Sequence, residues 1–84
     1  MDESTLKRLT ELKEKRGAIE VSWLKSAAGK LLPTSRRGEI LEVTSDGIRL
    51  NHVDDFISSP SFQRITHGSE MIFDIHDFIG GERA

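Results

Sequence analysis

The chain has 84 residues and no cysteine, with 12 Lys and Arg against 14 Asp and Glu. This length suits a single domain over residues 1–84, and the lack of cysteine excludes a disulfide framework, a thiolate zinc site and a cysteine nucleophile. Apolar runs are too short to cross a membrane, and the acidic start lacks the apolar stretch of a secretory signal, so we expect a cytoplasmic protein without a membrane partner.

Residues 1–16 have the pattern of an amphipathic helix. Leucines recur every three residues and fall on one helical face. Acidic and short polar residues at 2–4 suit the positive end of the helix dipole. Basic residues at 13–16, followed by Gly17, suit the C-terminal end. The sequence therefore predicts one helix ahead of the rest of the domain.

A β-rich body is predicted for residues 18–79. Residues 18–24 alternate between apolar and polar side chains, which is typical of a half-buried strand with Trp23 on its inner face. Residues 25–30 are small, polar and basic and predict a loop or a loose hairpin end. Pro33 is expected to end the short strand that follows this loop, because proline cannot donate a ladder hydrogen bond.

The clearest β-signal is a hairpin with strands at 40–43 and 48–53, joined by an Asp-Gly turn. A Ser-Pro pair favours a short helical turn over 60–64. Alternation predicts a last strand over 71–75 with Met71, Phe73 and Ile75 facing inward, and the glycine-rich end at 80–84 predicts a flexible tail.

We therefore predict an α+β fold in which an N-terminal helix packs on a small, strongly bent antiparallel sheet or barrel of four to five strands. The residues expected to form the core are Leu6, Leu9, Leu12, Ile19, Val21, Leu41, Val43, Ile48, Leu50, Phe73 and Ile75.

This outline resembles SH3-type barrels and their Sm-like variant. The resemblance rests on GAIEVSWL as a first strand, GEILEVTSDGIRL as a long bent hairpin and HGSEMIFDI as a late strand. It covers most of the chain, and the helix at the start is similar to that of Sm-like proteins. It implies a fold rather than a ligand.

A second resemblance is to PilZ domains. The turn from Glu42 to Gly47 is similar to the second PilZ element, with Glu and Thr in place of its first two defining residues. Arg16 stands just before the first strand, but Leu12 occupies the place of a partner arginine. This resemblance implies binding of a cyclic dinucleotide through a degenerate site.

Charge is distributed unevenly along the chain. Residues 1–40 hold nine basic and six acidic residues, and residues 41–84 hold three basic and eight acidic ones. The run between Val21 and Gly38 has four basic residues and no acid. Such a run attracts phosphates through counterion release, and a nearby aromatic ring can stack on bases. The candidate binding residues are Lys25, Lys30, Arg36 and Arg37 in a basic loop at 25–37, with Arg16, Lys13 and Trp23 adjoining.

We expect a non-enzymatic binding or adaptor module that contacts an anionic partner, a nucleic acid or a nucleotide, through this basic loop. A protein–protein or homo-oligomerising module is the first alternative, because the basic and acidic halves could attract one another between copies. A merely solvated loop also fits the pattern.

Catalytic and metal signatures are weak. The chain lacks the Gly-x-Ser-x-Gly elbow, and Leu31 stands where a P-loop would need Ser or Thr. His52 and His76 could approach each other if their strands pair, but a zinc site needs three or four converging ligands. We therefore expect no catalytic residues, no metal and no cofactor.

Overall fold

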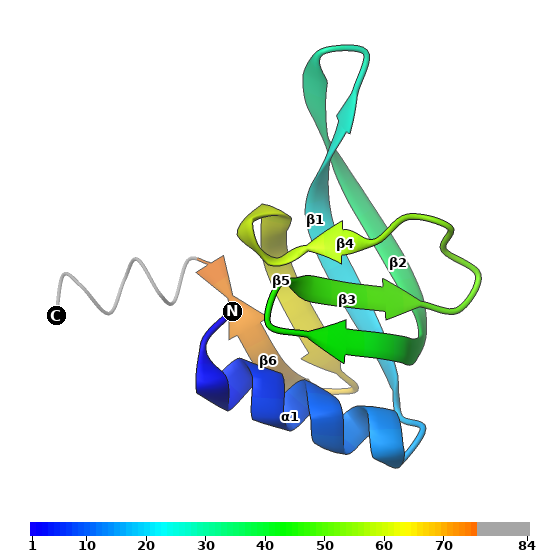
Figure 1. Cartoon of the computed structure of the whole chain (residues 1–84), viewed down its shortest axis with the longest axis vertical. Helices are drawn as coiled ribbons and strands as arrows, with labels where there is room; N and C mark the ends of the chain where they lie inside the picture. Colours follow the sequence, from blue (N-terminus) through cyan, green and yellow to red (C-terminus); the bar gives the residue numbers. More distant parts are fainter. Residues whose placement is uncertain (76–84) are drawn as a thin grey trace, which may run out of the picture.

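The computed structural model describes residues 1–75, and the predicted turn at 76–79 and tail at 80–84 lie outside this range. The elements are α1 (Glu3–Glu14), β1 (Ala18–Ala27), β2 (Lys30–Thr44), β3 (Gly47–Leu50), β4 (Ile57–Ser58), a 3-10 turn η1 (Ser59–Ser61), β5 (Phe62–His67) and β6 (Glu70–Asp74) (Figure 1). The N-terminal helix and the α+β class are confirmed.

The strands form one antiparallel sheet in the order β4-β3-β2-β1-β5-β6, with β4 and β6 at its edges. Of the two forms expected, a bent sheet or a barrel, the structure therefore has the open sheet, and residues 1–75 contribute six strands to it rather than the expected four or five. The helix packs against β2 and β6, below the bent sheet in the view of Figure 1.

Strand β2 serves both halves of the sheet. Its first part pairs with β1 as far as Glu39, and its last part, from Ile40, pairs with β3. Asn51 fixes the junction, since its side-chain Oδ1 accepts the N–H of Glu39 at 2.9 Å and its own N–H donates to the Glu39 carbonyl at 2.9 Å. Gly38 gives Asn51 the space it needs, because a Cβ at residue 38 would overlap the Asn51 side-chain oxygen.

The core lies between the helix and the inner face of the sheet. Its buried apolar residues are Leu9, Leu12, Ile19, Val21, Trp23, Ile40, Ile48, Leu50, Ile57, Phe62 and Ile65. Six of the residues predicted for the core are therefore confirmed: Leu9, Leu12, Ile19, Val21, Ile48 and Leu50. Four more are only half-buried, namely Leu6, Val43, Phe73 and Ile75.

Two bulges overturn predictions about which side chains face inward. Leu41 is 56% exposed because it is the extra residue where the β2–β3 register shifts, and Ile40 takes the buried position instead. Met71 is also exposed, since a second shift between β5 and β6 leaves Ile72 unpaired and packed against the core. A single inserted residue reverses the alternation from which both predictions were made.

Two local predictions are refined by the structure. Of the two forms predicted for residues 25–30, a loop or a loose hairpin end, the structure has the hairpin end, because β1 continues to Ala27 and pairs with β2, which begins at Lys30. The helical turn predicted over 60–64 is shorter and earlier, since η1 spans Ser59–Ser61 and β5 follows at once.

The helix begins with a side-chain cap whose removal should be measurable. The Asp2 carboxylate accepts the N–H of Thr5 at 2.7 Å, and Asp2→Ala should lower the free energy of unfolding by about 1 kcal/mol. Hydrogen bonds from the Thr5 backbone and then its hydroxyl lower the pKa of Asp2, so this stabilisation is complete at neutral pH. It should disappear as the pH falls through that lowered pKa. Urea titrations of Asp2→Ala at several pH values test this, with exposed Glu3→Ala as the control.

Candidate functional site

A two-stranded hairpin projects from the body of the sheet, and we call residues Leu24–Thr34 the hairpin arm (Figure 1). Strand β1 pairs with β5 only between Glu20 and Trp23, and β2 pairs with β3 only from Ile40 onward. Among residues 1–75, therefore, no third strand lies beside the arm on either side. Most of the predicted basic loop at 25–37 is this hairpin rather than a loop.

The arm closes through a two-residue turn at Ala28 and Gly29, where φ is +52° and +78°. Positive φ at both positions is the type I′ geometry, whose twist matches that of the flanking strands. Glycine adopts it without strain, and alanine does so at a cost of about 1–2 kcal/mol. The turn fixes the register, because Ala27 and Lys30 form the pair that closes it.

Register determines which backbone groups of the arm are free. The closing pair of a two-residue turn is hydrogen-bonded, and hydrogen-bonded and non-hydrogen-bonded pairs alternate along the ladder. Leu24 and Ser26 therefore direct their N–H and C=O groups away from β2, and Leu31 and Pro33 direct theirs away from β1. Pro33 stands where no donor is needed, so the prediction that it would end the strand was wrong.

Apolar side chains are exposed on both faces of the arm. Leu31 is 64% exposed and lies on the outer face, opposite Ser26. Leu32 is 48% exposed and lies opposite Lys25 on the inner face, the same face as buried Trp23. These two leucines are among the most exposed large apolar side chains in residues 1–75.

A groove of about 420 Å³ runs along the β1 edge at the base of the arm. It is lined by Trp23, Leu24, Lys25, Ser26, Asp55, Phe56, Ser58 and Ser61. Phe56 is exposed, whereas Trp23 is only 5% exposed and belongs mainly to the core. Lys25 Nζ lies 3.0 Å from the Asp55 carboxylate across the groove. The groove thus combines two aromatic side chains with hydroxyls and one ion pair.

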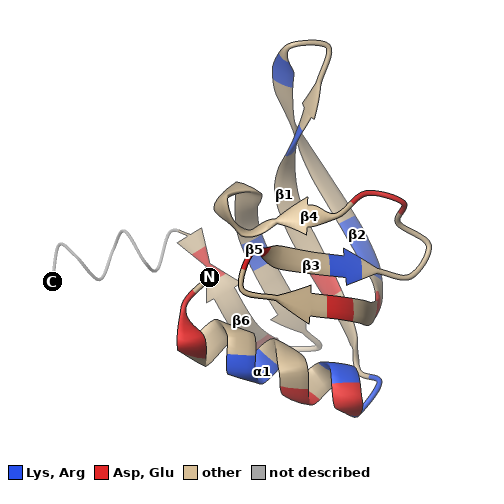
Figure 2. Ribbon diagram, viewed as in Figure 1, with Lys and Arg blue, Asp and Glu red and all other residues tan. Residues whose placement is uncertain are grey.

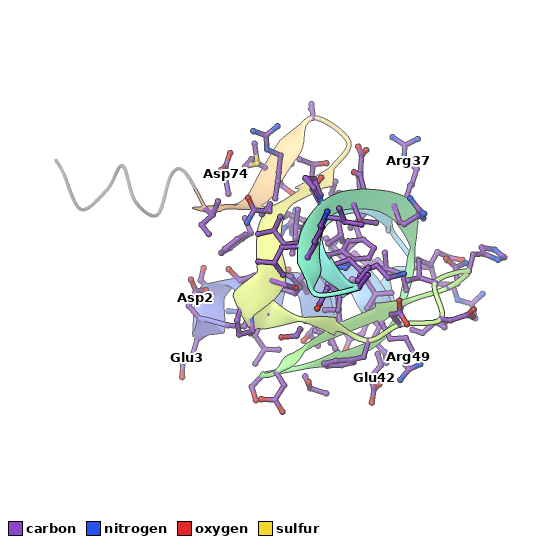
Figure 3. All side chains as sticks on the ribbon, turned by 90° about the horizontal axis from the view of Figure 1, so that it is seen from above. Asp2, Glu3, Arg37, Glu42, Arg49 and Asp74 are labelled. Carbon is purple, nitrogen blue, oxygen red and sulfur yellow. The ribbon has the colours of Figure 1, made fainter. Side chains whose placement is uncertain are left out.

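The structure does not gather the predicted basic residues into one patch. Arg36 and Arg37 are neighbours on a strand and lie on opposite faces, and Arg37 points away from the body in Figure 3. Arg36 donates to the Ser35 carbonyl at 2.8 Å and lines a second groove beside His52 and Asp54. Figure 2 shows blue positions scattered over the arm, the sheet and the helix.

The remaining basic candidates lie at distant points of the fold. Lys30 is at the tip of the arm and Lys25 at its base, held by Asp55. Lys13 is exposed on α1, and Arg16 follows the helix with φ +57°. Trp23 joins the core, is 5% exposed and also lines the groove at the base of the arm.

The two PilZ-like elements are not brought together. The amino group of Met1 donates to the Ser45 carbonyl at 3.3 Å, so the turn from Glu42 to Gly47 lies beside the start of the helix. Arg16 lies at the other end of the same helix. A helix of this length separates them by about 18 Å at 1.5 Å per residue.

The second histidine of the suggested pair, His76, falls outside the described residues. Its partner His52 is exposed in a turn with φ +62°. Within residues 1–75, no three His, Cys, Asp or Glu side chains converge as a set of metal ligands.

A charged contact that the sequence did not predict ties the helix to the sheet edge. Arg8 donates to the Glu70 carboxylate of β6 and also lies 3.4 Å from Glu11. The Glu70 hydrogen bond raises the pKa of Arg8, and the Arg8 hydrogen bond lowers the pKa of Glu70. These groups are surface-exposed and distant from the arm, so we interpret the contact as structural.

No family model, curated protein or solved structure matches the chain. Across the part of the chain that the structure describes, no helix is long and apolar enough to span a membrane.

Proposed function

We propose that this protein is a non-enzymatic binding module whose contact surface for another protein is the hairpin arm. The observation that carries the proposal is the exposure of Leu31 and Leu32 on a hairpin that extends beyond both neighbouring strands. A two-stranded hairpin is marginally stable alone in water, and apolar side chains exposed on both faces of this projection favour an interaction with another protein.

The charge arrangement favours a protein over a phosphate-bearing partner. Nucleic-acid binding by counterion release needs several cations directed at one backbone. In the arm, Lys25 is already neutralised by Asp55, and the cations that follow the arm lie on opposite faces of β2. Full burial of a leucine side chain contributes about 1.5–3 kcal/mol, so Leu31 and Leu32 can contribute more to binding than these separated charges.

A photo-cross-linking amino acid at Lys30, introduced in the native host, tests this proposal. We expect a discrete adduct with one protein from position 30, and no such adduct from the same cross-linker at exposed Lys13 on the helix. The adduct should disappear in Leu31→Ser/Leu32→Ser. Because both leucines are exposed, that variant should keep its unfolding free energy within about 0.5 kcal/mol. Identical adducts from both positions, or an adduct that persists in the double variant, would contradict the proposal.

A further inference from the structure

We infer that the arm takes its partner by strand addition, with an extended acidic segment of another protein pairing along the β1 edge at Leu24 and Ser26. This inference rests on the proposed function and adds to it the partner's backbone conformation and charge. Strand addition uses main-chain hydrogen bonds for affinity and side-chain pockets for specificity.

Only one edge of the arm can accept a strand over its full length. On the β1 side, Leu24 and Ser26 present N–H and C=O groups that pair with no other described strand. On the β2 side the corresponding positions are Leu31 and Pro33, and proline has no N–H to donate. The β2 edge therefore lacks one of the donors that an added strand needs, whereas the β1 edge keeps both of its donors.

The groove lies where an added strand would place its side chains. The groove runs beside residues 23–26 of β1. Strand β5 begins at Phe62, which pairs with Trp23, so β5 does not extend alongside the residues of β1 that follow Trp23. Phe56 and Trp23 contribute aromatic side chains to its lining, and Ser58 and Ser61 contribute hydroxyls. A volume of about 420 Å³ accommodates an apolar side chain together with its backbone.

Charge complementarity favours an acidic segment. No acid occurs between Val21 and Gly38, and Lys30 makes no ion pair with any described residue. Lys30 lies opposite Ala27 on the inner face, and the small Ala27 side chain leaves room for a carboxylate from a neighbouring strand. Lys25 is already held by Asp55, so the residue opposite it is expected to be apolar and to enter the groove.

A second copy of the chain fits this edge poorly. The antiparallel register that pairs Leu24 with Ser26 of the second copy also places the two Lys25 side chains directly opposite each other. The fitting occupant is therefore a segment of a different protein.

Two short valine-rich peptides are the probes for a titration followed by amide NMR; both carry valine at the position expected opposite Lys25, and one carries glutamate and the other lysine at the position expected opposite Ala27. We expect the acidic peptide to bind about tenfold more tightly, with the Leu24 and Ser26 amides becoming protected from hydrogen exchange and the Ser35 amide unchanged. Trp23 is the single tryptophan and gives an independent fluorescence signal at the groove.

Ser26→Pro removes the Ser26 N–H, which points away from β2, and leaves the hydrogen bonds between β1 and β2 intact. This substitution should weaken binding of the acidic peptide about tenfold or more. Ser35→Pro is the matched control, because Ser35 lies opposite Ser22 and directs its N–H to the other edge. Equal effects of the two prolines, equal affinity for both peptides, no binding of either peptide, or binding of an oligothymidylate in their place would overturn the inference.

The cross-linking experiment separates the inference from the proposed function. If the adduct at position 30 is lost in Leu31→Ser/Leu32→Ser but persists in Ser26→Pro, the arm binds a protein and strand addition is wrong. If the adduct is absent in every variant and in the unaltered chain, the proposed function itself is wrong.

Discussion

Gly47→Ala should destabilise the protein by about 3 kcal/mol, at the upper end of the usual cost of overpacking. A Cβ at residue 47 would overlap the carbonyl oxygen of Ile57 and lie 2.9 Å from its carbonyl carbon. Gly47 pairs with Ser58, the last residue of the short edge strand β4, so the clash is with backbone and a side-chain rotation cannot relieve it. Urea unfolding followed by circular dichroism measures the loss.

Gly68→Ala is the matched control for this substitution. Gly68 has φ +61°, and a Cβ added at this residue would meet no atom within 4 Å, so alanine there carries only the backbone cost of about 1–2 kcal/mol. If Gly47→Ala cost no more than Gly68→Ala, the close approach of β4 to β3 would not be a determinant of stability.

Trp23→Ala should lower the free energy of unfolding by about 3–5 kcal/mol, the usual range for truncating a large buried aromatic side chain. Trp23 is 5% exposed and packs within the core cluster, although it also lines the groove beside the arm. Native proteins have total stabilities of about 5–15 kcal/mol, so this loss is a large fraction of the total. Denaturant titration measures this directly.

Trp23→Phe is the control, since it keeps an aromatic ring in the same position and should lose clearly less stability. The exposed pair Leu31→Ser/Leu32→Ser should show almost no loss on the same assay. A fully stable Trp23→Ala would mean that the indole serves the groove and not the core, which would reverse our interpretation of this residue.

The elements that local patterns predict well are those whose signals lie within a few residues. The helix is confirmed because leucine periodicity and the polar start at Asp2 are both local, and Asp2 is indeed its cap. The turn before Gly47 is confirmed for the same reason, since Asp-Gly between apolar runs specifies a hairpin by itself.

Strand details could not be predicted where pairing partners decide them. The bulge at Leu41 and the unpaired Ile72 exist only because β3 and β5 shift register against their neighbours. Likewise, Pro33 is compatible with a strand only because the Ala28-Gly29 turn places it at a position with no ladder hydrogen bond. Alternation along a single strand contains none of this information.

In the candidate site, too, local features could be predicted from the sequence, whereas contacts between distant residues could not. The acid-free run was visible in the sequence, but the partner of Lys25 is Asp55, which comes thirty positions later and is brought near by the segment between β3 and β4. The signal that points to the arm is the pair Leu31 and Leu32 next to a small-residue turn, and the local pattern predicts only a short strand there.

The shared strand β2 also has a kinetic consequence. The β1–β2 and β2–β3 hairpins each close through a two-residue turn, which is a fast local event. The pairing of β1 with β5 instead joins Glu20 to Thr66, and closing so long a loop is entropically slow. Folding should therefore begin with the three-stranded meander built on β2 and reach its rate-limiting step when β5 docks on β1. Until that moment the whole outer edge of β1, and not only its arm, is open to other strands.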